Sequence, residues 1–114
     1  MPTIYKICPA PLWRAAEAEG VFRGSPIDLA DGYIHLSTIA QVAETAARHF
    51  AGERDLVLAA IESARLTAPL RYEAARNGDL FPHLYGDLPL AAVLWVKPLP
   101  LGGDGRHVFP EIVP

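Results

Sequence analysis

The hydrophobic and polar positions of this chain follow the two-residue repeat of strands over several short blocks. The block at residues 56–62 is apolar on both alternating faces, which predicts a central strand covered on each side. A last strand is expected from Arg106 to Val113, and Pro110 favours a place for it at a sheet edge. Further strand-like runs lie at residues 3–7, 33–37, 70–73 and 91–97.

Two segments have helical signals instead. A helix is expected at residues 11–19, because proline suits its first turn and Gly20 suits its end. Residues 38–41 have the pattern of a capping box, so a second helix is expected to begin there and to close at Gly52. Surface loops rich in Gly, Pro and Asp are expected at residues 21–31 and 76–89, of which the second is apolar enough to form a pocket wall.

The order of these elements predicts an α+β protein with a small, mainly antiparallel, strongly curved sheet and two helices. At 114 residues we expect a single domain spanning residues 1–114. The net charge of −3, without a run of Lys or Arg, disfavours an extended nucleic acid as partner. Cys8 is the only cysteine, and no apolar stretch reaches the about 18 residues of a membrane helix, so we expect a cytoplasmic protein without membrane contact.

The candidate chemistry gathers in two apolar segments, residues 32–38 and 81–86. Each holds a histidine between large apolar neighbours, with a hydroxyl residue two positions further on. Residues two apart on an extended chain share a face, so His35 would lie beside Ser37, and His83 beside Tyr85. Two such faces predict one polar pocket for a small-molecule ligand. The alternative is that each histidine is a core or edge residue hydrogen-bonded to backbone.

Other residues support weaker hypotheses. A metal site could combine His35 and His83 with Asp31 or Glu73, but the helical spacing typical of metal ligands is missing, so no metal is predicted. Ser37 lacks the glycine-flanked elbow of serine hydrolases. The side chains expected to serve structure or surface alone are Cys8 and Trp13 in the core and Arg14, Arg23, Arg48 and His49 on the surface.

Characteristic segments lie along almost the whole chain: Ile4-Tyr5-Lys6-Ile7, Trp13, Gly24-Ser25, residues 31–38, Asp55-Leu56-Val57-Leu58, Tyr72-Glu73 and residues 81–86. Together they resemble a small bacterial family, domain of unknown function 952. They resemble in turn the ADP-ribosyltransferase superfamily, whose first motif places His or Arg on a strand, followed by Ser or Thr, to hold the ribose of NAD. His35 and Ser37 match that motif in type and spacing.

This resemblance implies an ADP-ribosyltransferase-like enzyme acting on NAD, as a substrate, or on a related nucleotide. Cleavage of NAD passes through a cationic ribose, so such a site grips ribose hydroxyls and places a carboxylate near the positive charge. The implied catalytic residues are His35, Glu73 and His83, and the implied binding residues are Tyr33, Ser37 and Tyr85.

Three alternatives remain open. A non-catalytic module could hold a nucleotide or another small molecule in the same pocket. An RNA 2′-phosphotransferase would need basic side chains, which the acidic balance of the chain disfavours. Glu73 could pair with Arg71 or Arg76 at the surface rather than serve the site.

Overall fold

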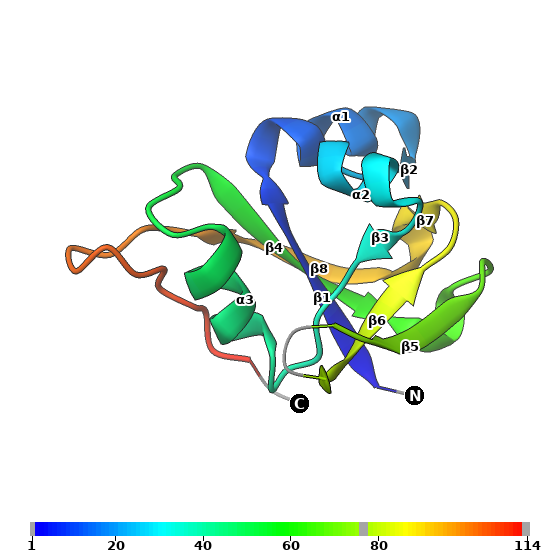
Figure 1. Ribbon diagram of the computed structural model, residues 1–114. Helices are drawn as coiled ribbons and strands as arrows, with labels where there is room; N and C mark the ends of the chain where they lie inside the picture. The colour runs from blue at the N-terminus through cyan, green and yellow to red at the C-terminus, as the bar shows by residue number, and fades with distance from the viewer. Residues whose placement is uncertain (1, 76–77, 113–114) are drawn as a thin grey trace.

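The longest strands form an antiparallel sheet at the centre of the protein (Figure 1). The structure, a computed structural model, describes residues 2–75 and 78–112. The strands β1 (Thr3–Pro9), β4 (Leu56–Glu62) and β8 (Val93–Leu99) pair in the order β1-β4-β8. The sequence pattern of β4 predicted a central strand, and its place between β1 and β8 confirms this prediction.

A second antiparallel sheet carries the candidate residues. It has the order β3-β6-β5 and consists of β3 (Ile34–His35), β6 (Leu80–Leu84) and β5 (Leu70–Ala74). Two backbone hydrogen bonds of 2.8 and 2.9 Å between Tyr5 and Ser37 join this sheet to β1. A smaller pair is formed by β2 (Val21–Phe22) and β7 (Leu88–Pro89).

Within the described residues three α-helices connect the strands, one more than predicted. They are α1 (Ala10–Glu19), α2 (Pro26–Asp31) and α3 (Val42–His49), with short 3-10 helices η1 (Ser63–Arg65) and η3 (Leu90–Ala92). Gly20 ends α1 with a φ of 83°, which a residue with a Cβ rarely adopts, so the predicted end is confirmed. The second predicted helix is shorter than expected, because α3 has Gln41 as its N-cap and ends at Phe50 rather than Gly52. The Gln41 side chain accepts the Thr38 N–H at 3.1 Å in the turn before the helix.

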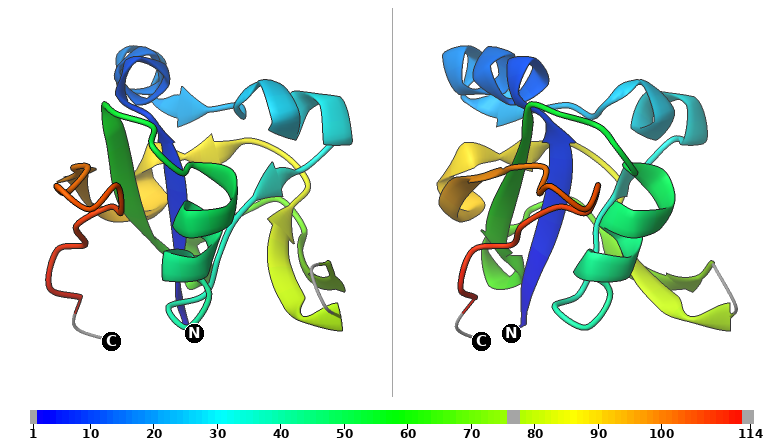
Figure 2. Two further views of the ribbon diagram at one scale, coloured as in Figure 1. Left: turned by 60° about the vertical axis from the view of Figure 1, so that its left-hand side comes forward. Right: turned by 90° about the vertical axis from the view of Figure 1, so that its left-hand side faces the viewer.

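Apolar side chains cover both faces of the central sheet. Along β1, Ile4 and Cys8 belong to one buried cluster with Trp13 of α1, and Tyr5 and Ile7 belong to another. The second cluster includes Val42 and Ala46 of α3, which lies beside β1, while α1 crosses the end of the sheet (Figure 2). Because alternate residues of one strand enter different clusters, each side chain of β1 has a fixed environment.

The predicted loop at residues 21–31 is wrong. It contains β2 and α2, and α2 begins at a capping box in which the Ser25 side chain and the Asp28 side chain each accept a backbone N–H of the other residue. The Gly and Pro content that suggested a loop marks the ends of a short helix instead, since Pro26 occupies its first turn and Gly32 its end.

Two later expectations also need correction. Within residues 76–89, of which 76 and 77 lie outside the described residues, β6 and β7 replace the expected loop. Proline has no backbone N–H, so Pro82 disfavours a strand. Its carbonyl nevertheless accepts the Leu36 N–H at 3.1 Å, and strand pairing continues through this acceptor. The strand expected at residues 106–113 is absent up to residue 112, where the described part ends, apart from one bridge between Leu101 and His107.

No helix among the described residues is long and apolar enough to cross a membrane.

Candidate functional site

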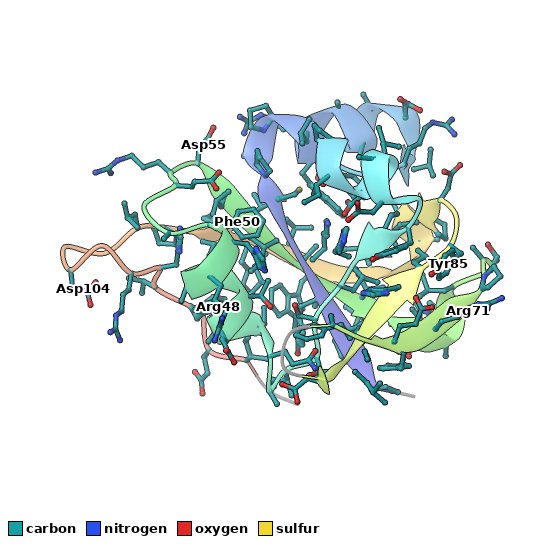
Figure 3. All side chains as sticks on the ribbon, in the orientation of Figure 1. Arg48, Phe50, Asp55, Arg71, Tyr85 and Asp104 are labelled. Atoms are coloured by element: carbon teal, nitrogen blue, oxygen red, sulfur yellow. The ribbon has the colours of Figure 1, made fainter. Side chains whose placement is uncertain are left out.

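A cavity of about 500 Å³ opens between α2, the β3-β6 pair and α3. It lies between α3 on one side and the strands β5 and β6 on the other. In Figure 3 the labels Arg48 and Phe50 mark the side of α3, and the labels Arg71 and Tyr85 mark the side of the strands. Its walls are mostly apolar, with Tyr5, Ile7, Leu36, Phe50 and Phe81 among the lining residues. The volume lies within the range of roughly 300 to 1,000 Å³ that is usual for small-molecule sites.

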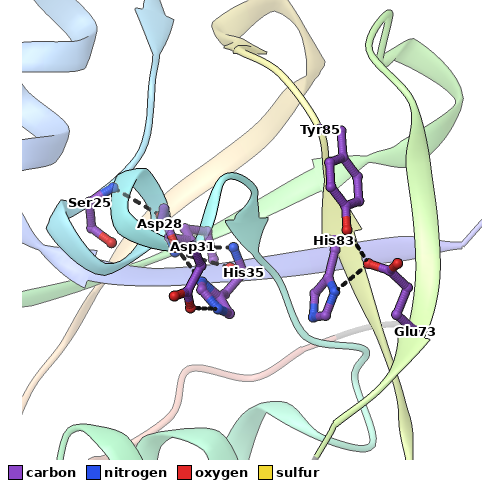
Figure 4. Close-up of polar contacts among 8 residues, drawn as sticks. Ser25, Asp28, Asp31, His35, Glu73, His83 and Tyr85 are labelled. Atoms are coloured by element: carbon purple, nitrogen blue, oxygen red, sulfur yellow. Dashed lines mark hydrogen bonds and ion pairs between the residues drawn. The ribbon is translucent and has the colours of Figure 1, made fainter.

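His35 and His83 both line this cavity, as predicted. They are paired directly across β3 and β6, and their ring centroids lie 5.7 Å apart with an edge-to-face orientation. Directly paired residues of antiparallel strands share one face of the sheet, so this register alone brings the two imidazoles together. Figure 4 shows Asp28 and Asp31 beside the ring of His35, and Glu73 beside the ring of His83.

A buried carboxylate, Asp28, fixes one side of the site. Its Oδ2 accepts hydrogen bonds from Lys6 Nζ at 2.8 Å and from the Ser25 N–H at 2.9 Å. Its Oδ1 accepts the His35 N–H at 3.1 Å and faces His35 Nδ1 at 2.6 Å. Burial alone would raise the pKa of Asp28, but the hydrogen bond from His35 and the charge of Lys6 outweigh it, and the pKa stays well below its usual range.

The other nitrogen of His35 faces a second carboxylate. His35 Nε2 lies 3.0 Å from Asp31 Oδ2, at the end of α2. The imidazole is therefore held between Asp28 and Asp31, and both of its nitrogens donate together only in the imidazolium form. A direct bond from His35 to a ligand requires Asp31 to move, which its half-exposed side chain permits. The sequence analysis assigned His35 to a ribose hydroxyl without foreseeing either partner.

Glu73 organises the opposite side of the site. Its Oε1 accepts a hydrogen bond from the Tyr85 hydroxyl at 2.6 Å and lies 2.8 Å from His83 Nδ1 (Figure 4). Because Arg71 is the register partner of His83 on β5, Glu73 stands two residues on and reaches His83 diagonally. The bond from Tyr85 and then the bond from His83 lower the pKa of Glu73. Donation to Glu73 raises the pKa of Tyr85.

This arrangement sets the hydrogen-bonding role of His83. With Nδ1 donating to an ionised carboxylate, a neutral His83 carries its lone pair on Nε2. The ring of His83 is buried against Tyr33, which stacks on it at a centroid distance of 4.1 Å and an interplanar angle of 19°. Among the described residues, the site therefore has an imidazole oriented by a carboxylate, the geometry of a general acid or base.

Two hydroxyls lie on the side of the cavity nearer α3. The Ser37 Oγ and the Thr45 Oγ1 are 3.0 Å apart, and both residues line the cavity. Ser37 thus shares the cavity with His35, as the two-residue spacing predicted, although its hydroxyl bonds to Thr45. His49 is exposed, as expected, but it also lines the cavity, which the sequence did not indicate.

Tyr85 differs from its predicted position. It was expected to point into the pocket, but it is partly exposed, and its hydroxyl contacts Glu73 instead of lining the cavity. For Glu73 the sequence left two places open, in the site or in a surface pair with Arg71 or Arg76. Arg76 lies outside the described residues, while Arg71 stands over the Tyr85 ring at 5.4 Å, and the carboxylate of Glu73 bonds to His83 and Tyr85.

Sequence reasoning missed Lys6 and Asp28. Lys6 is buried in the middle of an apolar strand, and a lysine in such a run indicates a buried acidic partner. The expected burial of Cys8 and Trp13 and the expected surface positions of Arg14, Arg23 and Arg48 are confirmed. The three arginines form exposed ion pairs with Asp55, with Glu19 and Asp87, and with Glu44, respectively.

In the part of the chain that the structure describes, no three His, Cys, Asp or Glu side chains are grouped so that they could hold a metal ion. The nitrogens of His35 face Asp28 and Asp31, whereas Nδ1 of His83 faces Glu73, so the two imidazoles bond to different carboxylates.

Fold and site together define a small α+β protein with a histidine-lined cavity. The chain belongs to the family described as "Protein of unknown function (DUF952)", which matches residues 7–96. The crystal structure of protein CC0527 from Caulobacter crescentus is similar, with 47% sequence identity over 93% of both chains and a TM-score of 0.88. The solution NMR structure of CC0527 gives 48% identity over 93% of this chain and 91% of that chain, with a TM-score of 0.82. No curated protein matches the chain.

Proposed function

We propose that the cavity binds NAD or a related nucleotide and that the protein is an ADP-ribosyltransferase-like enzyme that cleaves the bond between ribose and nicotinamide. The observation that supports this proposal best is the Glu73–His83 pair, with Nδ1 of the imidazole held at 2.8 Å and the rest of the ring in the cavity wall. A carboxylate-oriented imidazole is suited to take a proton from an attacking hydroxyl.

The proposed reaction balances without an added cofactor. Water or an acceptor hydroxyl attacks C1′ of the ribose, and the electron pair of the glycosidic bond leaves with nicotinamide, which becomes neutral. The proton of the nucleophile passes to Nε2 of His83. Positive charge that develops on the ribose is stabilised by a nearby carboxylate.

The positions of the carboxylates assign their roles in this proposal. Glu73 acts as a positioning residue, because its Oε1 is already occupied by His83 and Tyr85. Asp31 lines the cavity, and His35 holds its carboxylate in place, so Asp31 is the group that meets the ribose. Tyr33 offers its ring to the flat base, and Ser37 a hydroxyl to the sugar.

A binding module without turnover is the second candidate. It is supported by His35, whose two ring nitrogens both face carboxylates, and by Glu73, whose Oε1 is occupied by His83 and Tyr85. A cavity with aromatic walls and few available charges can hold a flat ligand without acting on it.

Calorimetric titration with NAD and with ADP-ribose, followed by chromatography for free nicotinamide, tests both candidates. Binding with nicotinamide release supports the enzyme, and binding without release supports the module. If neither compound binds at millimolar concentration, the nucleotide proposal is wrong. The variant His83→Asn should keep the binding and lose the release.

A further inference from the structure

The charges around the cavity are predominantly negative. The carboxylates of Asp28, Asp31 and Glu73 all lie within hydrogen-bonding distance of the site histidines. Lys6 compensates Asp28 alone, through a contact of 2.8 Å between two buried side chains. Among the residues that the structure describes, no arginine lines the cavity.

The field of these carboxylates reaches the aromatic wall. Burial first, and then the charges of Asp31 and Glu73, raise the pKa of Tyr33. Tyr33 contacts both histidines, at centroid distances of 4.7 Å to His35 and 4.1 Å to His83. A ligand ring beside Tyr33 would therefore lie near these two carboxylates.

Aromatic rings add to this preference. Tyr5, Tyr33, Phe50 and Phe81 line the same cavity. The face of an aromatic ring attracts a cation within about 6 Å of its centroid, and the attraction increases when water is excluded. Aromatic walls combined with a carboxylate at the rim are typical of sites that recognise a permanently cationic nitrogen.

We infer that the cavity selects a planar cationic ring over its neutral counterpart and that Asp31 is the residue that sets this selectivity. The inference rests on the proposed function and extends it to the charge of the ligand: the pyridinium of oxidised NAD fits, and the uncharged dihydropyridine of reduced NAD does not. Asp31 has this role because its carboxylate lines the cavity and is 43% exposed, so ligand and carboxylate can meet.

The experiment compares oxidised with reduced NAD by competition, in the wild type and in Asp31→Asn. A second pair, 1-methylnicotinamide and neutral nicotinamide, has no glycosidic bond and reports charge preference without turnover. The matched control is Asp55→Asn, which removes a carboxylate from the turn before β4, away from Tyr85 and Arg71 (Figure 3). Circular dichroism melting confirms that each variant is folded.

We expect the wild type and Asp55→Asn to bind the oxidised form about tenfold more tightly than the reduced form, and Asp31→Asn to bind them within about threefold. Equal affinities in the wild type, or a ratio that persists in Asp31→Asn, overturn the inference and leave the proposed function intact. If 1-methylnicotinamide binds in preference to nicotinamide but neither nucleotide binds, the proposed function fails and the charge selectivity stands. If none of the four compounds binds, both are overturned.

Discussion

Asp28→Asn should be among the most damaging conservative substitutions in the protein. The carboxylate accepts four hydrogen bonds, and its side chain is 1% exposed. An amide supplies one acceptor oxygen and turns its NH₂ group toward donors, while Lys6 becomes a buried cation without a counter-charge. Breaking a buried ion pair in this way costs about 3 to 5 kcal/mol. We therefore expect the free energy of unfolding to fall by that amount.

Substitution of the partner, Lys6, shows how much of this loss comes from the unpaired charge. Lys6→Met removes one of the four hydrogen bonds to Asp28 and the bond from Lys6 Nζ to the His35 carbonyl at 3.0 Å. Asp28 keeps its bonds from Ser25 and His35, so the loss should be smaller than in Asp28→Asn. In Asp28→Asn/Lys6→Met no unpaired cation remains, and the loss should be smaller than the sum of the two single losses. The exposed pair of Arg23 and Asp87 provides the control, since Asp87→Asn should cost at most about 1 kcal/mol.

The pH dependence supplies an independent check. The pKa of Asp28 is lowered on folding, so the unfolded chain binds its proton first as the pH falls. The stabilisation is complete above the ordinary aspartate pKa of about 4 and is lost progressively below it. Urea unfolding followed by tryptophan fluorescence at pH 7, 5 and 3.5 measures the difference between wild type and Asp28→Asn. A difference below about 1 kcal/mol at pH 7, or one that does not shrink on acidification, would refute the reasoning.

Four further outcomes follow from single contacts. Glu73→Gln should lower nicotinamide release about 100-fold with little change in melting temperature; unchanged release would remove Glu73 from the mechanism. Tyr85→Phe should raise the pKa of Glu73, so the rate should begin to fall at a higher pH on acidification, and an unmoved acid limb would contradict this. Leu58→Ala should cost about 2 to 5 kcal/mol in urea unfolding and Leu94→Ala far less, because Leu58 is fully buried and Leu94 is exposed; equal losses would contradict the packing. Burial raises the pKa of the Cys8 thiol to about 11, so the folded protein should react slowly with a disulfide reagent at pH 8, and fast labelling would show that the strand opens.

The elements that could be predicted from the sequence are those whose buried faces give a clear pattern of apolar residues. In β4, four consecutive residues from Leu58 to Ile61 are fully buried, and both faces are accordingly apolar. The helix α2 has no such pattern, because Asp28 alone of its six residues is buried. Six residues are also too few to form a helix without tertiary support. For α2 this support comes from Asp28, which bonds to Lys6 on β1, 22 residues away, and to His35 on β3, beyond the end of the helix. Ser25 and Asp28 do have the spacing of a capping box, and this was the local signal that could have located the helix.

The candidate site was predictable in part for the same reason. The spacing of His35 and His83 within apolar runs indicates two half-sites, but only the register between β3 and β6 places them side by side on one face of the sheet. The partners of the histidines could not be assigned, because Glu73 reaches His83 through a diagonal neighbour relation and Asp31 reaches His35 from a helix that the sequence did not predict.

The two histidines depend on the fold to different degrees, and this difference affects how the site can be tested. The partner of His35 is Asp28, which also holds Lys6 and the start of α2, so changes on this side alter stability and site geometry together. The partner of His83 is Glu73, a half-exposed side chain on the edge strand β5, so its loss leaves the core unchanged. Since stability and function are separable on the β5-β6 side, variants of Glu73 and Tyr85 can assign a catalytic role without a folding defect. Variants of His35 require the stability measurements described for Asp28 before a loss of activity can be attributed to chemistry.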